Sequence, residues 1–224
     1  MASEKYLAMN KMIKEISVIK TLRFNFHYFK FREAVRLPVI VSRHVLVNCL
    51  GGSIKLTGAI RSGYIRIGFQ GVPVFDRYRS RTVWNVGGGT VIFKGRAEIG
   101  QGCRIGSGGV LTFGDNFQIT AETTIICEDS ITFGRDVLCS WQCQIVDTDY
   151  HQIITDGEPR KVTSPVSIGD HVWIGSRVLI NKGSEIADNS VIADGSTITG
   201  KFRETNTLLA GVPAAVKKTN INWR

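Results

Sequence analysis

An apolar residue recurs at every sixth position through much of the chain, and this repeat constrains the fold more than any other feature. The spacing runs from Phe93 to Ile145 with two insertions of two residues, and resumes from Ile168 to Ile198 without insertions. A helical period of 3.6 does not return one face at every sixth position, and plain strand alternation does not place small residues at fixed offsets. The fifteen anchors of the repeat are Phe93, Ile99, Ile105, Phe113, Ile119, Ile125, Phe133, Cys139, Ile145, Ile168, Ile174, Ile180, Ile186, Ile192 and Ile198.

Small residues accompany the anchors at two offsets. Glycine often follows an anchor directly, as at Gly100 and Gly114, and a small or β-branched residue often stands four positions after an anchor, as at Ala97 and Cys103. Six-residue units with one inward anchor and a small residue near each corner predict a triangular coil of three short parallel strands, with about 18 residues per turn. Fifteen anchors then make about five turns.

The two insertions support the coil independently, because the segments around them lie twenty residues apart. This spacing places Leu111 over Ile131 and Phe113 over Phe133 in adjacent turns. Residues 51–92 carry only fragments of the pattern, which predicts a looser opening turn there.

The repeat over residues 91–200 resembles the hexapeptide repeat of left-handed parallel β-helices, and the expected handedness rests on that resemblance. The expected fold is therefore all-β. Residues 1–50 would form a helical and irregular cap, residues 51–200 the β-helix with an inserted loop at 146–166, and residues 201–224 a C-terminal tail. A helix is predicted over residues 3–22, where its role is to cap the open end of the coil, from the spacing of Met9, Met12, Ile13, Ile16 and Ile19.

The net charge of +9 is concentrated at the two ends of the chain. Residues 1–36 contribute +5, residues 37–199 contribute 0, and residues 200–224 contribute +4. A neutral body with basic ends argues against a nucleic-acid-binding protein and suits a phosphate-bearing small ligand or an acidic membrane surface. The aromatic and basic run 24–32 is the alternative to a purely capping N-terminus, since it could rest on an anionic membrane.

Other features of the composition limit the class of protein to which this chain can belong. No window holds the ~18 apolar residues of a membrane span, and the N-terminus does not read as a signal peptide, so we expect a soluble cytoplasmic chain. Five cysteines without a CxxC pair predict reduced core residues, and neither a disulfide framework nor a zinc site.

The repeat stops between Ile145 and Ile168 for one long excursion, which holds a histidine preceded by two carboxylates, Asp147 and Asp149. A neutral imidazole can accept a proton at physiological pH, and a carboxylate on its other ring nitrogen fixes the tautomer. His151 is the candidate base. Either aspartate could orient it, and the sequence does not choose between them.

The segment around His151 resembles the catalytic segment of hexapeptide-repeat acetyltransferases. The resemblance implies that His151 deprotonates an acceptor, which attacks the thioester of acetyl-coenzyme A directly. The stretch VWIGS at 172–176 resembles that family's groove-lining segment. His171, beside it, either contacts the acceptor or occupies a corner of the coil.

The segment AGVPAAVKK at 210–218 resembles the tail that contacts coenzyme A in this family, although Gly200 and Ala215 stand where many relatives have lysine. The resemblance implies binding of coenzyme A by Trp173, Gly175, Ser176, Ala193, Gly195, Lys201, Pro213, Ala214, Lys217 and Lys218.

The N-terminal stretches at 20–26, 37–40 and 65–68 resemble bacterial acetyltransferases of capsular or surface polysaccharide synthesis. We therefore expect a homotrimeric O-acetyltransferase with sites between neighbouring chains, a carbohydrate acceptor, acetyl-coenzyme A as cosubstrate and no metal. The alternatives are N-acetylation of an amino sugar on a nucleotide-linked precursor, and a non-catalytic scaffold. A zinc enzyme would need three converging histidines, and cysteine catalysis is disfavoured because Cys139 and Cys143 fall on inward positions.

Overall fold

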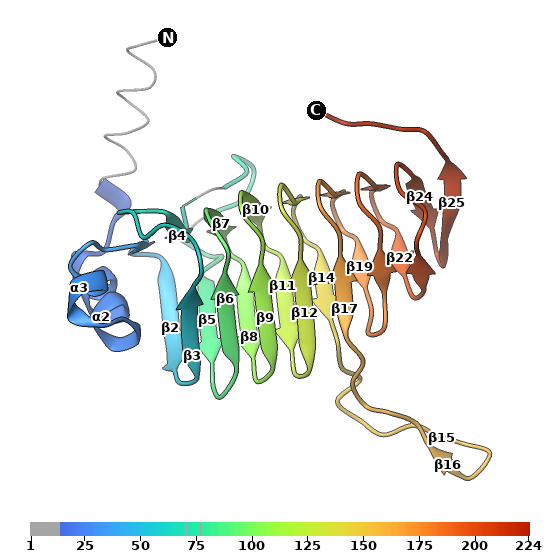
Figure 1. Ribbon diagram of the computed structural model, residues 1–224, viewed down its shortest axis with the longest axis horizontal. Helices are drawn as coiled ribbons and strands as arrows, with labels where there is room; N and C mark the ends of the chain where they lie inside the picture. Colours follow the sequence, from blue (N-terminus) through green and yellow to red (C-terminus); the bar gives the residue numbers. More distant parts are fainter. Residues whose placement is uncertain (1–13, 70, 77) are drawn as a thin grey trace.

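The computed structural model describes residues 14–69, 71–76 and 78–224, and its strands wind into a three-sided parallel coil (Figure 1). The first face contains β1 (Val39–Val41), β4 (Ile65–Ile67), β7 (Ala97–Gln101), β10 (Phe117–Ala121), β13 (Leu138–Cys139), β18 (Trp173–Ile174), β21 (Val191–Ile192), β24 (Leu208–Gly211) and the antiparallel β25 (Ala214–Lys218). The second face contains β2 (Val45–Leu50), β5 (Thr82–Val86), β8 (Arg104–Ser107), β11 (Thr124–Cys127), β14 (Gln144–Val146), β19 (Leu179–Ile180) and β22 (Thr197–Ile198). The third face contains β3 (Ser53–Leu56), β6 (Thr90–Phe93), β9 (Val110–Phe113), β12 (Ser130–Phe133), β17 (Val166–Ile168), β20 (Glu185–Ile186) and β23 (Lys201–Phe202).

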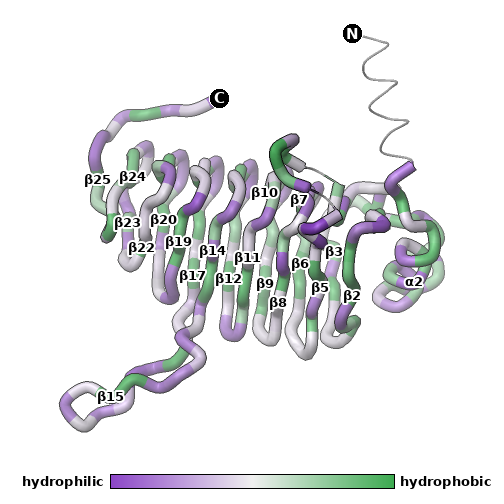
Figure 2. Tube along the Cα trace, turned by 180° about the vertical axis from the view of Figure 1, so that it is seen from behind, coloured by the Kyte–Doolittle hydropathy of each residue, from purple (hydrophilic) through white to green (hydrophobic). Residues whose placement is uncertain are grey.

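The core is the column of anchors that the repeat predicts. All fifteen are buried, and hydrophobic residues alternate with hydrophilic ones along the strands (Figure 2). The predicted register is confirmed, with Leu111 paired to Ile131 and Phe113 to Phe133. The ring of Phe113 stacks between those of Phe93 and Phe133, with centroids 5.1 and 5.6 Å away. The six-residue spacing thus fills one continuous apolar core.

The corners explain the small residues of the repeat. A Cβ on Gly114 would lie 2.0 Å from the carbonyl oxygen of Gly134 in the next turn, so only glycine fits there. The corners also require left-handed backbone, which glycine and asparagine adopt most readily. One column of stacked residues with left-handed backbone joins the third face to the first, and it comprises Asn116, Asp136, His171, Asn189 and Asn206.

The coil begins at Val39, earlier than the sequence indicates. Strands β1 to β6 form two complete turns, and Ile65 pairs with Ala97 while Val83 pairs with Arg104. The long connection between β4 and β5 hides this regularity in the sequence, because it separates strands that remain in register. Two strands, β1 and β2, lie within the first 50 residues, which the sequence assigns to the cap.

The cap consists of α2 (Val18–Tyr28) and α3 (Phe31–Ala34), which lie against the first turn (Figure 1). The Asn25 side chain donates to the Val39 carbonyl at 2.7 Å and accepts from the Val39 N–H at 3.1 Å. The Thr21 hydroxyl accepts from the Val41 N–H at 3.1 Å. These side chains satisfy the open edge of β1, which would otherwise leave unpaired backbone groups.

The helix predicted over 3–22 lies mostly outside the described residues; within them Lys14 and Glu15 are helical, Ile16 and Ser17 interrupt the helix, and α2 begins at Val18. Met9, Met12 and Ile13 lie outside the described residues. Ile16 forms an isolated bridge with Ser42, and Ile19 is on the outer surface of α2. Within the described ranges, no helix is long and apolar enough to span a bilayer.

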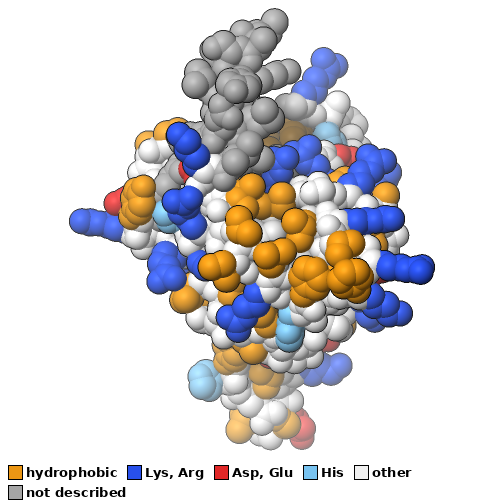
Figure 3. Space-filling view, turned by 90° about the vertical axis from the view of Figure 1, so that its left-hand side faces the viewer, with side chains coloured by type: hydrophobic (Ala, Val, Ile, Leu, Met, Phe, Trp, Pro, Cys, Tyr) orange, Lys and Arg blue, Asp and Glu red, His pale blue; other side chains and the backbone are white. Residues whose placement is uncertain are grey.

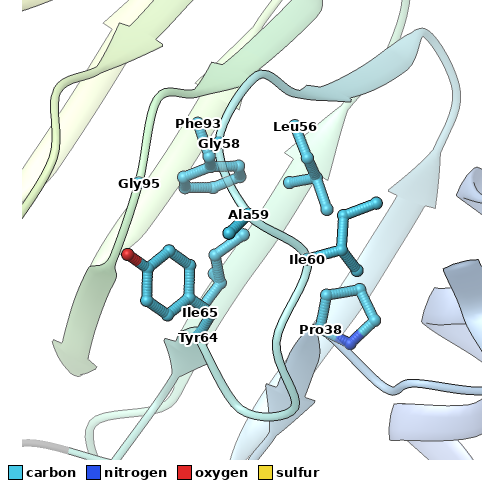
Figure 4. A pocket seen from close by; sticks show the side chains of 9 residues that line it. All are labelled: Pro38, Leu56, Gly58, Ala59, Ile60, Tyr64, Ile65, Phe93 and Gly95. Carbon is cyan, nitrogen blue, oxygen red and sulfur yellow. The ribbon is translucent and has the colours of Figure 1, made fainter.

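A small pocket lies beneath the connection from β3 to β4 (Figure 4). Pro38, Leu56, Ile60 and Phe93 line it, and Tyr64 provides its phenol ring. The lining is almost wholly apolar and holds no group suited to acid–base chemistry. It is a packing gap near the cap.

Candidate functional site

The excursion at 146–166 is a two-stranded hairpin that projects from the corner between the second and third faces (Figure 1). At its base Thr148 and Thr163 form an antiparallel bridge, and the Asp149 N–H donates to the Val162 carbonyl at 2.9 Å. Near its tip β15 (Ile154–Thr155) pairs with β16 (Glu158–Pro159). Backbone pairing therefore gives this segment a defined direction away from the coil.

Asp147 anchors the base of the hairpin. Its side chain is fully buried, and its two carboxylate oxygens accept the backbone N–H groups of Glu128 at 2.8 Å and Asp129 at 2.9 Å. Two charge-assisted bonds from backbone donors fix this carboxylate in place. Asp147 therefore ties the hairpin to the turn before it.

Asp149 forms an ion pair with Lys182, with 2.5 Å between the carboxylate oxygen and the ammonium nitrogen. The same ammonium donates to the carbonyls of Lys161 and Val162 on the returning strand. Lys182 therefore joins both strands of the hairpin base to the corner of the following turn. The Asp149 side chain remains about one-third exposed.

His151 lies just beyond these two aspartates and is exposed. Its backbone N–H donates to the Asp149 carbonyl at 2.7 Å, and the preceding Tyr150 has a φ of 59°. In the part of the chain that the structure describes, no hydrogen bond joins the His151 ring to either aspartate. The hairpin therefore places Asp147, Asp149 and His151 in one segment, but the His151 ring forms no hydrogen bond with either carboxylate in this structure.

A groove of about 960 Å³ runs along the second face beside the hairpin. Asn85, Arg104, Thr124 and Glu128 are among its polar side chains, and Tyr150 of the hairpin closes one side. Burial, followed by the charges of Glu128 and Asp147, raises the pKa of Tyr150, so this phenol stays protonated at neutral pH. Hydroxyl, amide, guanidinium and carboxylate groups together suit a polyhydroxylated ligand.

Sequence reasoning missed these groove residues. Arg104 and Glu128 lie at outward positions between anchors, where the repeat places no constraint on residue type, while Asn85 precedes the first anchor and Tyr150 lies in the excursion. Arg104 pairs with Thr124, and Gly106 with Ile126, so the strand register predicts which outward-facing residues lie next to one another. Gly108 leaves room for a carboxylate, because a Cβ there would lie 2.6 Å from Glu128 Oε2.

The predicted donor residues Gly175, Ser176, Ala193 and Gly195 stack on the corner between the first and second faces. The Gly195 N–H donates to the Ser176 carbonyl at 2.9 Å, and a Cβ on Gly175 would lie 2.7 Å from the Ile192 carbonyl oxygen. We call the part of this corner that these four residues form the C-terminal corner. Gly175 lets adjacent turns approach closely, whereas Gly195 is exposed and a Cβ there would meet no atom within 4 Å, so the surface at Gly195 has room for a narrow ligand.

Asp194 holds the C-terminal corner together. Its carboxylate accepts hydrogen bonds from the Ser176 hydroxyl and from the Arg177 guanidinium, which spans adjacent turns. These bonds, that from Ser176 first, hold the pKa of Asp194 below its ordinary value.

The C-terminal tail continues from this corner. Gly211 pairs with Ala214, and the connection passes through a cis Val212–Pro213 bond before Lys217 and Lys218 on β25. Both lysines are exposed.

Lys201 is placed differently from the other donor candidates. It lies on β23 of the third face and faces Glu185, 3.9 Å between the charged atoms. The structure therefore brings the tail to the C-terminal corner and separates Lys201 from it.

His171 occupies a corner of the coil and holds the chain end. Its ring stacks on Trp223 with centroids 4.3 Å apart and planes at 7°, and the Trp223 indole N–H donates to the His171 carbonyl at 2.9 Å. Trp173 is nearby, with its ring centroid 6.1 Å from that of Trp223, and its indole N–H donates to the Ser140 hydroxyl at 3.2 Å. These contacts give His171 a structural role, and its left-handed backbone follows from its place in the corner column.

Three of the buried cysteines, Cys103, Cys127 and Cys139, are unsuited to nucleophilic chemistry, whereas a hydrogen bond with Cys139 lowers the pKa of the buried Cys143. Burial raises the pKa of Cys103 and of Cys127 to about 12, and hydrogen bonding to Cys143 and burial raise the pKa of Cys139. All five thiols are free. Within residues 14–69, 71–76 and 78–224, no three His, Cys, Asp or Glu side chains converge as metal ligands would.

Comparison with known proteins agrees with this architecture. Residues 165–200 match the family described as bacterial transferase hexapeptide (six repeats). A protein of Klebsiella pneumoniae described as an uncharacterized 24.8 kDa protein in the cps region is 31% identical, over 97% of this chain and 100% of its own length. The polySia specific acetyltransferase NeuO has a similar structure, with a TM-score of 0.51 and 20% identity, over 81% of this chain and 89% of its own.

The fold is a left-handed parallel β-helix of hexapeptide repeats, as the repeat and its resemblance predict. The chain belongs to the hexapeptide-repeat acyltransferase family. Its fold is that of the hexapeptide-repeat acetyltransferases.

Proposed function

We propose that this protein transfers an acetyl group from acetyl-coenzyme A to a sugar hydroxyl, at a site formed between two neighbouring chains. The observation that carries the proposal is the placement of the two halves of the site. The His151 hairpin leaves the corner between the second and third faces, while the donor residues stack on the corner between the first and second faces. One prism cannot bring them together, whereas a closed trimer of prisms can.

The chemistry follows from His151 as general base. Its neutral imidazole takes the proton of the acceptor hydroxyl as the oxygen attacks the thioester carbonyl, so that a C–O bond forms. Collapse of the tetrahedral intermediate breaks the C–S bond, and the thiolate of coenzyme A leaves and receives the proton from the imidazolium.

Asp149 is the better candidate to orient His151. Both carboxylate oxygens of Asp147 are held by backbone donors inside the molecule, whereas Asp149 is partly exposed and has a flexible lysine as its partner. A small change in the hairpin would let the Asp149 carboxylate accept from the imidazole. Asp149 is then a positioning residue and Asp147 an anchor.

Coenzyme A supplies the activated acetyl thioester, and the C-terminal corner fits its narrow pantetheine arm. Gly175, Ser176 and Gly195 offer backbone and small side chains there, and Trp173 offers an apolar surface. Lys217 and Lys218 are exposed cations that suit the nucleotide phosphates. Lys201 would contribute only if it faced a neighbouring chain.

A carbohydrate acceptor suits the groove beside the hairpin. Arg104, Glu128 and Asn85 supply donors and acceptors for hydroxyl groups, close to the hairpin that carries His151. The Klebsiella relative is described as lying in a cps region, and NeuO as specific for polySia. A capsular or surface polysaccharide, or its precursor, is therefore the proposed acceptor.

The test is thiol release from acetyl-coenzyme A against a panel of sugars, nucleotide sugars and oligosaccharides. The protein should release thiol with one acceptor class, and His151→Ala should lower turnover by ~10²–10⁴ while coenzyme A binding stays nearly unchanged. His27→Ala, which changes an exposed histidine of the cap, is the matched control and should retain turnover. Full turnover in His151→Ala would remove this residue from the mechanism, and no thiol release with any acceptor would favour a scaffold.

A further inference from the structure

The outer surface of α2 carries apolar residues, which departs from the pattern of an ordinary surface helix. Val18, Ile19, Leu22 and Phe26 are exposed, and Ile19 is 80% exposed. A surface helix normally turns its apolar stripe toward the core. In α2 the inward positions hold Phe24 together with Thr21 and Asn25, which the open edge of β1 requires, and the other four apolar residues lie outside.

The second cap helix extends this surface. Phe31 is 72% exposed, its ring centroid lies 6.1 Å from that of Phe26, and Val35 is also exposed. We call Val18, Ile19, Leu22, Phe26, Phe31 and Val35 the cap patch. Figure 3 views this end of the molecule, where hydrophobic side chains gather centrally and Lys and Arg side chains surround them. A contiguous apolar surface with a charged rim marks an interaction site.

Positive charge surrounds the cap patch. Exposed Arg23, Lys30, Arg32 and Arg36 belong to the same two helices or follow them directly. Over residues 14–36, six Lys or Arg residues outnumber two Glu residues. The partner that matches this surface is both apolar and anionic.

A basic groove adjoins the patch on the side of β2. It has a volume of about 480 Å³, and Lys20, Arg23 and Arg81 line it together with apolar residues of β2. Burial, followed by the charges of Arg43, Lys20 and Arg81, lowers the pKa of His44 nearby. An excess of positive charge therefore extends from the cap into a recess where a phosphate group can enter.

We propose that the cap patch docks the protein peripherally on an anionic phospholipid membrane. The apolar side chains enter the interface between headgroups and acyl chains, and the surrounding cations contact lipid phosphates. Part of the aromatic run 24–32 does not take part, because Phe24 and Phe29 are buried under the cap. The inference is independent of acyl transfer.

The test is co-sedimentation of the full chain with vesicles of phosphatidylcholine alone and with vesicles containing about 25% phosphatidylglycerol. One variant, Ile19→Ser/Phe31→Ser, removes exposed apolar area, and a second, Arg32→Glu/Arg36→Glu, reverses rim charge. All four side chains are exposed, so both variants should keep the wild-type melting temperature. Val216→Ser, an exposed apolar residue on β25 at the opposite end of the coil, is the matched control.

We expect binding to the anionic vesicles, weakening as salt rises, and little binding to phosphatidylcholine. Both cap variants should bind at least about tenfold more weakly, and the control variant should bind as the wild type does. Absence of wild-type binding, or equal binding by the cap variants, would overturn the proposal. So would a change of oligomeric state in the cap variants, measured by light scattering, without vesicle binding, because the patch would then be an interface between copies.

Discussion

Asp147 offers a quantitative test of how the hairpin is held. Asp147→Ala would remove the two bonds that its carboxylate accepts at 2.8 and 2.9 Å from the backbone of residues 128 and 129. A hydrogen bond to a charged group contributes about 1.5–3 kcal/mol, which gives an upper bound of about 6 kcal/mol for the pair. The freed N–H groups are only partly buried and can reach water, so we expect a loss of about 2–4 kcal/mol.

The assay is urea denaturation followed by circular dichroism, with Asp147→Asn as the intermediate case. Asparagine keeps one acceptor oxygen and turns an amide donor toward the second N–H, so its loss of stability should fall between zero and that of alanine. Asp156→Asn, at the exposed tip of the hairpin, is the control and should change stability by about 0.5 kcal/mol at most. Wild-type stability in Asp147→Ala would refute the anchoring role.

Three further predictions follow from the core, an ion pair and the proposed base. Phe113→Ala should lower the free energy of unfolding, measured in urea, by about 3–5 kcal/mol, because the ring is stacked between two others and its removal leaves a cavity. A decrease below about 1 kcal/mol would contradict the importance of this stack. The backbone N–H and guanidinium of Arg135 lower the pKa of Asp170, so the ionised carboxylate stabilises the fold at pH values above its unfolded pKa near 3.8. Asp170→Asn should therefore reduce the free energy of unfolding by about 1 kcal/mol at most at neutral pH. This difference between the two proteins should vanish as the pH falls through the lower pKa of the folded state. Turnover with a hydroxyl acceptor should rise with pH and then level off, as expected for a single general base, whereas a continued rise at higher pH would indicate a free amine acceptor.

The coil could be predicted from the sequence because its signal is periodic. Each anchor meets the same environment one turn away, so six-residue spacing, corner glycines and the twenty-residue insertions all specify one register. The sequence underestimates the extent and regularity of the first two turns, because the long connection between β4 and β5 interrupts the six-residue spacing while the strands on either side stay paired in register. The register of Leu111 and Phe113 was predictable to the residue.

The candidate site was less accessible to sequence reasoning, for two physical reasons. The repeat fixes inward positions and leaves outward ones free, so Arg104 and Glu128 carried no signal. The spacing of Asp147 and Asp149 also could not show which carboxylate the backbone would occupy. Their difference arises from burial, which depends on contacts with residues of the preceding turn, eighteen and nineteen positions earlier.

The cap illustrates a different difficulty. A helical spacing of apolar residues ordinarily predicts a buried stripe, yet α2 places Thr21 and Asn25 against β1 and leaves Ile19 outside. The requirement of an unpaired strand edge for hydrogen bonds overrides hydrophobic patterning here. Sequence periodicity alone does not contain that requirement.

The most direct test of the account is complementation between two inactive variants in mixed oligomers. One variant, His151→Ala, lacks the base, and the other, Gly195→Trp, blocks the C-terminal corner, where glycine has a φ of 69°. Co-refolding them in equal amounts should restore about a quarter of wild-type turnover if each site takes its base and its donor corner from neighbouring chains of a trimer. No recovered turnover from mixed oligomers shown to form would mean that one chain supplies both halves, and would contradict the shared site.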